Sequence, residues 1–423
     1  MKDLRTEAIA GITTFFTMAY IVVVNPSILC TDGTGMPFSG VLTATVLLSF
    51  VMTLAMGLYA DLPFAVAPGM GVNAFFTFNL ILGRHIPWPT ALGIVFWSGV
   101  LFLAVSATPL RANLALAMPK GVRSAAGAGI GVFLTFIGLK NAGLVVADPV
   151  TFVRLGELGP KPVLALVGMA LACALHLRKS AFSFLIPIAA VTGAGWAMGL
   201  VAAPRSLVSM PDFRGVFLKA DVLGALRPAL LPAMVSLMFT DLFDSISTFV
   251  GVAHATRLLD SDDNPKNLRQ GLLVDAFATL GAGLLGTSSG TAYIESTAGI
   301  EAGGRTGLTS VFTALCFLPC LFLAPLAGTV PGFATAPILI LVGAFMFRSV
   351  SGLELERLED AVPSFLTLVL IPLTFSITQG LLWGFLSHAV LYTLAGRRRE
   401  VPPFQYGLAA LSAGLLWLEH GAR

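Results

Sequence analysis

The sequence predicts an all-α polytopic membrane protein with fourteen transmembrane segments, arranged as two inverted seven-span repeats with short strands in the broken spans 3 and 10. Three observations predict this class. The 423 residues are 56% hydrophobic and 11% charged, whereas soluble domains carry about a quarter charged residues. About fourteen apolar stretches approach the roughly 20 residues that a helix needs to cross a bilayer. Two stretches are interrupted at matching places along the chain.

The expected spans follow one another with short connections, which leaves little chain for a soluble domain. They cover residues 8–29, 39–60, 69–82, 89–108, 121–140, 162–177, 181–202, 225–252, 269–286, 295–303, 306–327, 334–350, 361–377 and 379–396.

Lysine and arginine are unevenly distributed between the two sets of connections. With the N-terminus in the cytoplasm, the inside connections carry most of them, including the run Arg397-Arg398-Arg399. This asymmetry follows the positive-inside rule and predicts that both ends of the fourteen-span core are cytoplasmic. The net charge of +3 is too small to indicate a nucleic-acid partner.

One more apolar stretch, residues 404–419, follows Pro402 and Pro403. It is long enough to span the bilayer or to lie flat on it. Its polar or amphipathic residues favour interfacial packing.

Two segments are too short and too rich in glycine or proline for full helices: Pro63 to Asn73 and Gly286 to Gly299. Pro68 disfavours a helical conformation at Ala67. Each segment therefore predicts a short extended strand that leads into a half-helix. Such backbone is tolerated at membrane depth only where it is buried in protein or lines a cavity.

The spacing of these segments indicates a repeat. The stretch of chain from Gly71 to Glu295 is as long as the stretch from Thr17 to Asp241, so one constant offset relates both pairs. Because each half then holds an odd number of spans, the halves have opposite orientations. Paired broken segments in inverted repeats point to the binding site.

Two acids lie within the eighth span. Asp241 and Asp244 are three residues apart and share a helix face, which Thr248 continues. Buried acids in a bilayer are costly and usually face protein or water. We expect Asp241 to accept hydrogen bonds from a ligand and Asp244 to support it or take a proton. The alternative is a pair that only holds helices together.

Glu295 lies where the predicted strand becomes a half-helix. The N-terminus of a helix favours an ionised carboxylate, whereas burial favours the protonated form. A group between these effects can change protonation during transport, so Glu295, Asp241 and Asp244 are the proton-coupling candidates. The structural alternative, a helix cap, is a role that Glu fills poorly.

Several neighbours complete the predicted site. Backbone groups at Gly71 and Ile294 can contact the edge of a planar heterocycle. Phe239 can stack on its ring, although aromatic residues in membrane spans more often serve helix packing. Tyr20 and Thr17 form a polar strip on span 1. Asn73 either orients span 3 or makes an ordinary interhelical hydrogen bond. Asp275 lies one to two turns from the cytoplasmic Arg269 and is expected to be solvated near the interface, outside the site.

No nucleotide-binding, metal-binding or catalytic serine motif is recognisable, so we expect no cofactor, no metal and no enzyme activity. An ion gradient or the solute gradient then supplies the energy. The alternatives are an anion carrier on the same architecture, a channel or receptor, and a membrane enzyme. The anion carrier should aim a cation at its ligand, whereas this half-helix begins with Glu295.

Four motifs in order resemble the nucleobase–cation symporters of the second type, the nucleobase–ascorbate transporter superfamily, and within it the azaguanine-sensitivity branch of guanine, hypoxanthine and adenine permeases. They are Thr13 to Pro26, Ala67 to Phe76, Phe239 to Asp244 and Gly286 to Gly299. The chain departs from the branch at Gly290-Thr291, where two threonines are common, which puts substrate preference in doubt.

The resemblance implies a core domain (1–118 and 223–328, spans 1–4 and 8–11), a gate domain (119–222 and 329–398, spans 5–7 and 12–14) and a C-terminal apolar tail (399–423). It also implies a multi-pass protein of the bacterial cytoplasmic membrane, commonly a homodimer, that binds a purine between the strands of spans 3 and 10. We therefore expect a proton-coupled purine importer that works by alternating access, with the acids at Asp241 and Glu295 holding the purine.

Overall fold

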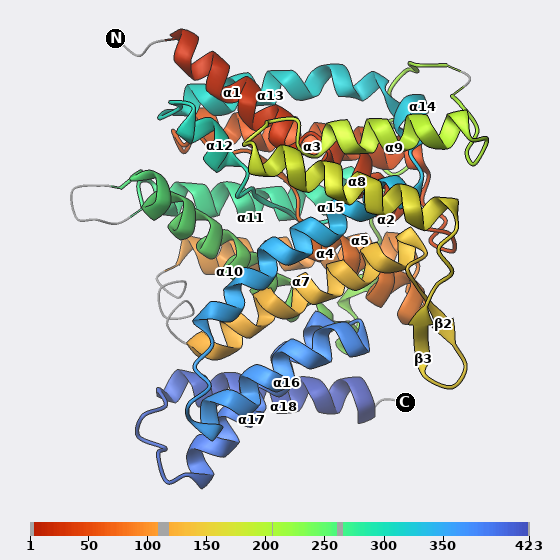
Figure 1. Cartoon of the computed structure of the whole chain (residues 1–423). Coiled ribbons are helices and arrows are strands. Elements are labelled where there is room, and N and C mark those ends of the chain that lie inside the picture. Colours follow the sequence, from red (N-terminus) through yellow and green to blue (C-terminus); the bar gives the residue numbers. More distant parts are fainter. Residues whose placement is uncertain (1–3, 109–117, 205, 260–264, 422–423) are drawn as a thin grey trace.

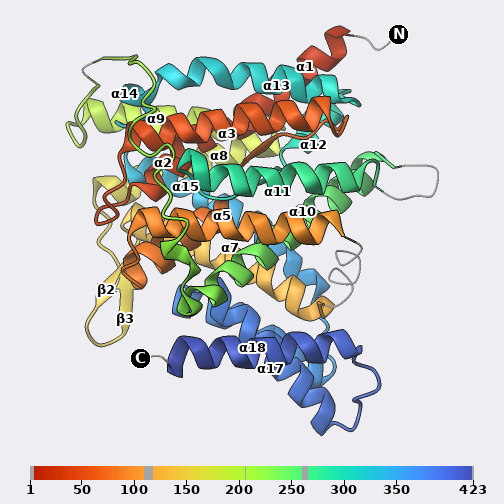
Figure 2. The same ribbon diagram turned by 180° about the vertical axis from the view of Figure 1, so that it is seen from behind.

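The computed structural model describes residues 4–108, 118–204, 206–259 and 265–421. Its long helices run side by side in alternating directions, as a chain crossing a bilayer requires (Figures 1 and 2). The first half contains α1 (Leu4–Met18), α2 (Ile21–Leu29), α3 (Phe38–Leu58), β1 (Val66–Pro68), α4 (Met70–Ala74), a π-helix η1 (Phe75–Gly83), α5 (Trp88–Ala107), α7 (Lys120–Ala142), β2 (Val145–Asp148), β3 (Phe152–Leu155), α8 (Pro160–Leu177) and α9 (Leu185–Ala197).

The second half contains η2 (Gly224–Leu226), η3 (Pro228–Leu230), α10 (Leu231–Thr256), α11 (Leu268–Leu285), β4 (Gly290–Ala292), α12 (Ser296–Glu301), α13 (Gly307–Phe317), η4 (Leu318–Phe322), α14 (Ala324–Ala327), α15 (Gly332–Phe347), η5 (Arg348–Gly352), α16 (Leu358–Thr374), α17 (Ile377–Leu394) and α18 (Pro403–Gly421). It has a strand and a short helix, β4 and α12, at the place that corresponds to β1 and α4 in the first half.

Within the described residues, eight helices are long and apolar enough to cross a membrane, with α1 and α2 counted as one. Met70–Gly83, Leu185–Ala197 and Gly307–Phe322 are shorter apolar helices. The mainly helical, polytopic class is thus confirmed, whereas the count of fourteen spans stays a prediction.

The two broken spans meet at the centre of the fold. β1 pairs antiparallel with β4, with Val66 opposite Ala292, Ala67 opposite Thr291 and Pro68 opposite Gly290. The central pair, Ala67 and Thr291, is separated by the same stretch of chain as Gly71 and Glu295. Each strand therefore pairs with its own counterpart, as a two-fold axis through the central pair requires. The inverted repeat is expressed directly in the backbone register.

Helix packing follows the same symmetry. α3 packs on α13, and its counterpart α11 packs on α5; α1 packs on α13, and α10 packs on α5. These helices form a first group around the strand pair. In a second group α7 and α15 pack against each other, α16 packs on α7, and α8 packs on α15. Small residues allow the close approach of α7 and α15, since a Cβ at Gly131 would lie 2.5 Å from the carbonyl oxygen of Gly343.

A β-hairpin that the sequence analysis did not predict joins α7 to α8. Strands β2 and β3 pair antiparallel and protrude from one end of the helices (Figure 1). The amides of Thr151 and Val150 donate to the carboxylate of Asp148 at 2.9 and 2.8 Å. These hydrogen bonds hold the pKa of Asp148 below its usual range. Polar turn chemistry at Asp148 was the available signal for this hairpin.

The C-terminal stretch is a single helix, α18, that runs alongside α17 rather than lying flat across the end of the bundle (Figure 2). Leu415 and Leu416 are buried against Leu382 of α17, so this face of α18 is used for helix packing. The expected interfacial position of 404–419 stays a prediction.

Candidate functional site

A cavity of about 330 Å³ lies between the two helix groups, next to the strand pair. One wall is formed by the first group, through Tyr20, the beginning of α4 with the preceding Gly69, α10, and the segment from β4 to α12. The opposite wall is formed by the second group, through α7, α15 and α17. The first wall supplies the carboxylates and the backbone groups at the ends of the strands and short helices, whereas the second wall is mostly apolar.

Glu295 lies at the junction that the sequence predicts. It is the residue before α12, its side chain makes no capping hydrogen bond, and it lines the cavity. The hydroxyl of Tyr20, a fully buried residue at the break between α1 and α2, donates to Glu295 Oε1 at 2.6 Å. Tyr20 also lines the cavity. The first span therefore positions the carboxylate that the tenth span provides.

The two acids of α10 are placed differently from the expectation. Asp244 lines the cavity, and within the described part of the chain its carboxylate has no hydrogen bond or ion pair. Asp241 is fully buried and does not line the cavity; its Oδ2 accepts from Ser289 Oγ at 2.5 Å and from Thr279. The predicted direct acceptor thus faces the strand, and the predicted supporting acid faces the cavity.

Asp275, expected near the interface, is instead fully buried on α11. Its Oδ2 accepts the backbone N–H of Ala292, in β4, at 3.1 Å. Its Oδ1, like Oδ1 of Asp241, has no hydrogen-bond partner among the described residues. Two acids therefore brace β4 from behind. The prediction for Asp275 rested on the nearby Arg269. It could not take account of β4, which covers this carboxylate only in the folded protein.

The backbone positions chosen from the sequence both border the cavity. Gly71 lies in the first turn of α4, where helix N–H groups lack intrahelical acceptors. A Cβ at Gly71 would lie 2.5 Å from Cγ2 of Ile130 on α7. The carbonyl of Ile294 already accepts from the amide and hydroxyl of Thr297, at 3.0 and 2.7 Å. The predicted contact between the Ile294 backbone and a ligand stays a prediction.

Of the aromatic and hydroxyl residues near the site, some line the cavity and others do not. Phe243 lines the cavity, whereas Phe239 stacks behind it, with ring centroids 6.0 Å apart. Thr248 borders the cavity on the predicted acid face. Thr17 does not; its hydroxyl donates to the carbonyl of Thr14 at 2.8 Å and lies 3.5 Å from the carbonyl of Glu295.

Asn73 belongs to a buried amide cluster behind the strands. Its Nδ2 donates to Oδ1 of Asn25 at 3.2 Å, and the Asn25 amide donates to Thr45 and Thr287 at 2.7 and 2.9 Å. This cluster connects spans 1, 2, 3 and 10. Asn73 therefore makes an interhelical hydrogen bond that also orients the third span.

The second wall was not foreseen. It includes Ile130, Arg123 and Ser124 of α7, together with Phe345 and Met346 of α15. Apolar residues such as Ile130, Phe345 and Met346 look like any lipid-facing or core residue in a membrane sequence, so only the fold brings them to the site. Among the described residues, no cluster of three His, Cys, Asp or Glu side chains could hold a metal ion.

Comparison with known proteins fits this architecture. Residues 5–382 match the model of a permease family, Xan_ur_permease. The chain is 40% identical over 400 residues to the adenine permease AdeP of Escherichia coli, covering 94% of this chain and 89% of AdeP. It is 39% identical over 418 residues to the guanine/hypoxanthine permease PbuO of Bacillus subtilis, covering 97% and 96%.

A solved structure supports the fold. The transmembrane domain of a cyanobacterial bicarbonate transporter, BicA, superposes with a TM-score of 0.66 at 19% identity, covering 91% of this chain and 98% of that domain. At this identity the likeness concerns the fold alone. The family match and the relatives together establish that the chain belongs to the nucleobase–ascorbate transporter superfamily of permeases, within the branch that contains adenine and guanine/hypoxanthine permeases.

Proposed function

We propose that this chain is a secondary active transporter that imports purine nucleobases by proton symport with alternating access. The names of AdeP and PbuO, an adenine and a guanine/hypoxanthine permease, support the substrate class. The cavity volume of about 330 Å³ lies at the small end of the range of roughly 300–1,000 Å³ for small-molecule sites.

The observation that carries the proposal is the pair of carboxylates on one cavity. Asp244 and Glu295 both line it, from spans 8 and 10. A neutral purine presents N–H donors along its edge, for which carboxylates are suitable acceptors. A site built for such bonds rejects analogues that lack them, because its buried acceptors are then left unpaired. Phe243 supplies an adjacent aromatic ring.

The remaining acids take supporting or proton-coupling roles in this proposal. Asp241 and Asp275 brace β4 through Ser289 and the amide of Ala292. Glu295 and Asp244 are the proton acceptors that a solute in the cavity can reach. Asp241 stays a coupling candidate through its position behind the strand, since Ser289 links it to the site.

Alternating access assigns the two helix groups to different bodies. The first group, residues 1–118 and 223–328, acts as the core that carries the purine. The second, residues 119–222 and 329–398, acts as the gate and as the contact in a homodimer. In this proposal both ends of the fourteen-span core lie on the cytoplasmic side of the cell membrane, an orientation that the distribution of Lys and Arg supports.

The test is uptake of radiolabelled hypoxanthine, guanine, adenine and uracil into proteoliposomes, with and without an inward proton gradient. We expect gradient-driven purine uptake that is lost in Glu295→Gln and Asp244→Asn. Asp148→Asn is the matched control, because it removes a carboxylate from the exposed turn of the hairpin and should leave uptake unchanged.

Folded protein that takes up no nucleobase would overturn the substrate assignment. Purine uptake that does not depend on the proton gradient would support the purine site and contradict proton coupling. Equal uptake by Glu295→Gln and wild type would remove the carboxylate from the mechanism.

A further inference from the structure

α18 runs antiparallel to α17 along most of its length. Near the start of α18 the hydroxyl of Tyr406 lies 3.1 Å from that of Thr393, close to the end of α17. Farther on, Leu415 and Leu416 pack with Leu382, close to the beginning of α17. Residue numbers rise along α18 while those of its contact partners on α17 fall, so the two helices are antiparallel.

α18 reaches the far end of the bundle. It contacts η3, the turn immediately before α10, whereas it begins beside the end of α17. Its 19 residues correspond to about 28 Å of helix, close to the roughly 30 Å of hydrocarbon in a bilayer. Within the described residues, α18 is not among the eight helices whose length and composition indicate a membrane span, so its crossing is inferred from its position in the bundle. Tyr406 lies near one end and the exposed Trp417 near the other, the positions that aromatic residues favour in membrane-crossing helices.

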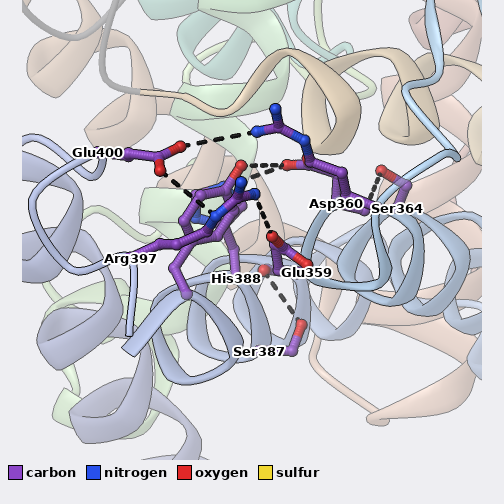
Figure 3. Close-up of polar contacts among 10 residues, drawn as sticks. Glu359, Asp360, Ser364, Ser387, His388, Arg397 and Glu400 are labelled. Atoms are coloured by element: carbon purple, nitrogen blue, oxygen red, sulfur yellow. Dashed lines mark hydrogen bonds and ion pairs between the residues drawn. The ribbon is translucent and has the colours of Figure 1, made fainter. Parts of the chain in front are cut away.

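The connection between α17 and α18 is fastened to the second helix group. Arg397 pairs with Glu359 of α16 at 2.6 Å and with Glu400 at 3.4 Å, and Arg357 pairs with Glu400 at 3.6 Å. Figure 3 shows Arg397, Glu359 and Glu400 converging between the beginning of α16 and the chain that leads into α18. Tyr392 of α17 adds a hydrogen bond to Asp360 of α16 at 2.7 Å.

The other side of α18 faces the first helix group. α18 contacts α10, and Val235 of α10 packs against the cluster of Leu382, Leu415 and Leu416. α10 is the helix that carries Asp241 and Asp244. About one turn beyond Val235, Phe239 of α10 contacts Phe385 of α17, with ring centroids 6.0 Å apart. α18 therefore covers one border between the two groups.

We propose that α18 is an additional membrane-crossing helix of the gate, which places the C-terminus on the side opposite residue 4 and forms part of the surface along which α10 moves. The first half of this inference is a statement of topology. The second half rests on the proposed alternating access.

The two sides of α18 differ in the physics of their contacts. Charge-assisted bonds tie the connection that leads into α18, through Arg397 and Glu400, to the beginning of α16. Such bonds require a fixed geometry. The contact with α10 is apolar and non-directional, so it can persist while α10 moves along the membrane normal relative to α18. A helix held in this way stays with the gate as the core moves.

Sidedness is tested with an epitope tag fused after residue 423, compared with the same tag fused before residue 1. In intact cells we expect impermeant antibody or protease to reach the C-terminal tag and not the N-terminal one. Both tags on one side would overturn the crossing, whether or not the protein transports anything.

Movement is tested by bridging cysteine pairs with a short bifunctional thiol reagent that a reductant cleaves, in a background where Cys30, Cys173, Cys316 and Cys320 are replaced by serine. Bridging Val235 to Leu415 or Leu416 should lower purine uptake at least tenfold, reversibly. The matched control, Thr393 bridged to Tyr406, joins α18 to its own group and should stay within twofold of the unbridged protein.

Undiminished uptake with α10 bridged to α18 would overturn the moving contact, as would loss of uptake in the control pair. If the unbridged proteins take up no nucleobase, the proposed function fails and the moving contact fails with it. The crossing itself is still decided by the tags.

Discussion

Replacing Gly71 by alanine places a methyl group into a narrow contact between the two helix groups. The added Cβ would lie 2.5 Å from Cγ2 of Ile130, about 1 Å inside the optimal carbon–carbon separation of roughly 3.5–4.0 Å. Ile130 is β-branched and restricted in χ1, so α4 or α7 must give way. Overpacking of this kind costs about 1–3 kcal/mol.

That free energy penalises the arrangement in which α4 touches α7. Since every 1.4 kcal/mol is a tenfold change, the population of this arrangement should fall by roughly 5- to 150-fold relative to one in which the groups are displaced. Initial rates of hypoxanthine uptake into proteoliposomes should therefore fall at least fivefold in Gly71→Ala. Ile130→Ala removes the clashing atoms, so the double variant should recover most of the lost rate.

The matched control is Gly251→Ala on α10, where an added Cβ meets no atom within 4 Å. Thermal unfolding in detergent separates a shifted equilibrium from general loss of structure. Uptake by Gly71→Ala at the wild-type rate would refute the reasoning. So would a double variant no better than Gly71→Ala, because the cost would then have a source other than Ile130.

Three further predictions concern the site. Tyr20→Phe removes the donor to Glu295, a hydrogen bond to a carboxylate worth about 1.5–3 kcal/mol. Purine uptake should fall about tenfold or more with the protein still folded, and an unchanged KM and kcat would contradict the contact. Phe243→Ala should raise the KM for hypoxanthine several-fold more than Phe239→Ala, and the reverse order would return the stacking role to Phe239. Asp275→Ala leaves a β4 amide without its acceptor, at a cost of about 1–3 kcal/mol. Its Tm should fall more than that of Glu157→Ala, which removes an exposed carboxylate, and equal Tm values would exclude the bracing role.

The sequence alone was sufficient for the parts of the fold that rest on periodicity and on local backbone rules. Pro68 and the glycines around Glu295 mark places where a helix cannot continue, and β1 and β4 begin and end within those segments. The constant offset between the two halves anticipated the register of the strand pair. These features are local, or repeat along the chain, so they are visible without coordinates.

The sequence was insufficient where a side chain's direction depends on how a helix is turned in the bundle. Asp241 and Asp244 share a helix face, but they differ by about 60° around the axis. That difference decides which of the two reaches the cavity, and it is set by the packing of α10 against α5 and α11. Asp275 illustrates the same limit, since its burial comes from β4, which lies beyond the end of its own helix.

The pairing of β1 with β4 also constrains the order in which the protein can be made. β1 leaves the ribosome long before the strand that completes it, because the two strands lie in opposite halves of the chain. An unpaired backbone at membrane depth is costly. Until Ala292 has been inserted, the first half of the chain holds an open strand edge that its own helices must shelter. A nascent chain that stalls before that point has one strand of the pair and no Glu295, so insertion of the second half is the step that both closes the edge and creates the site.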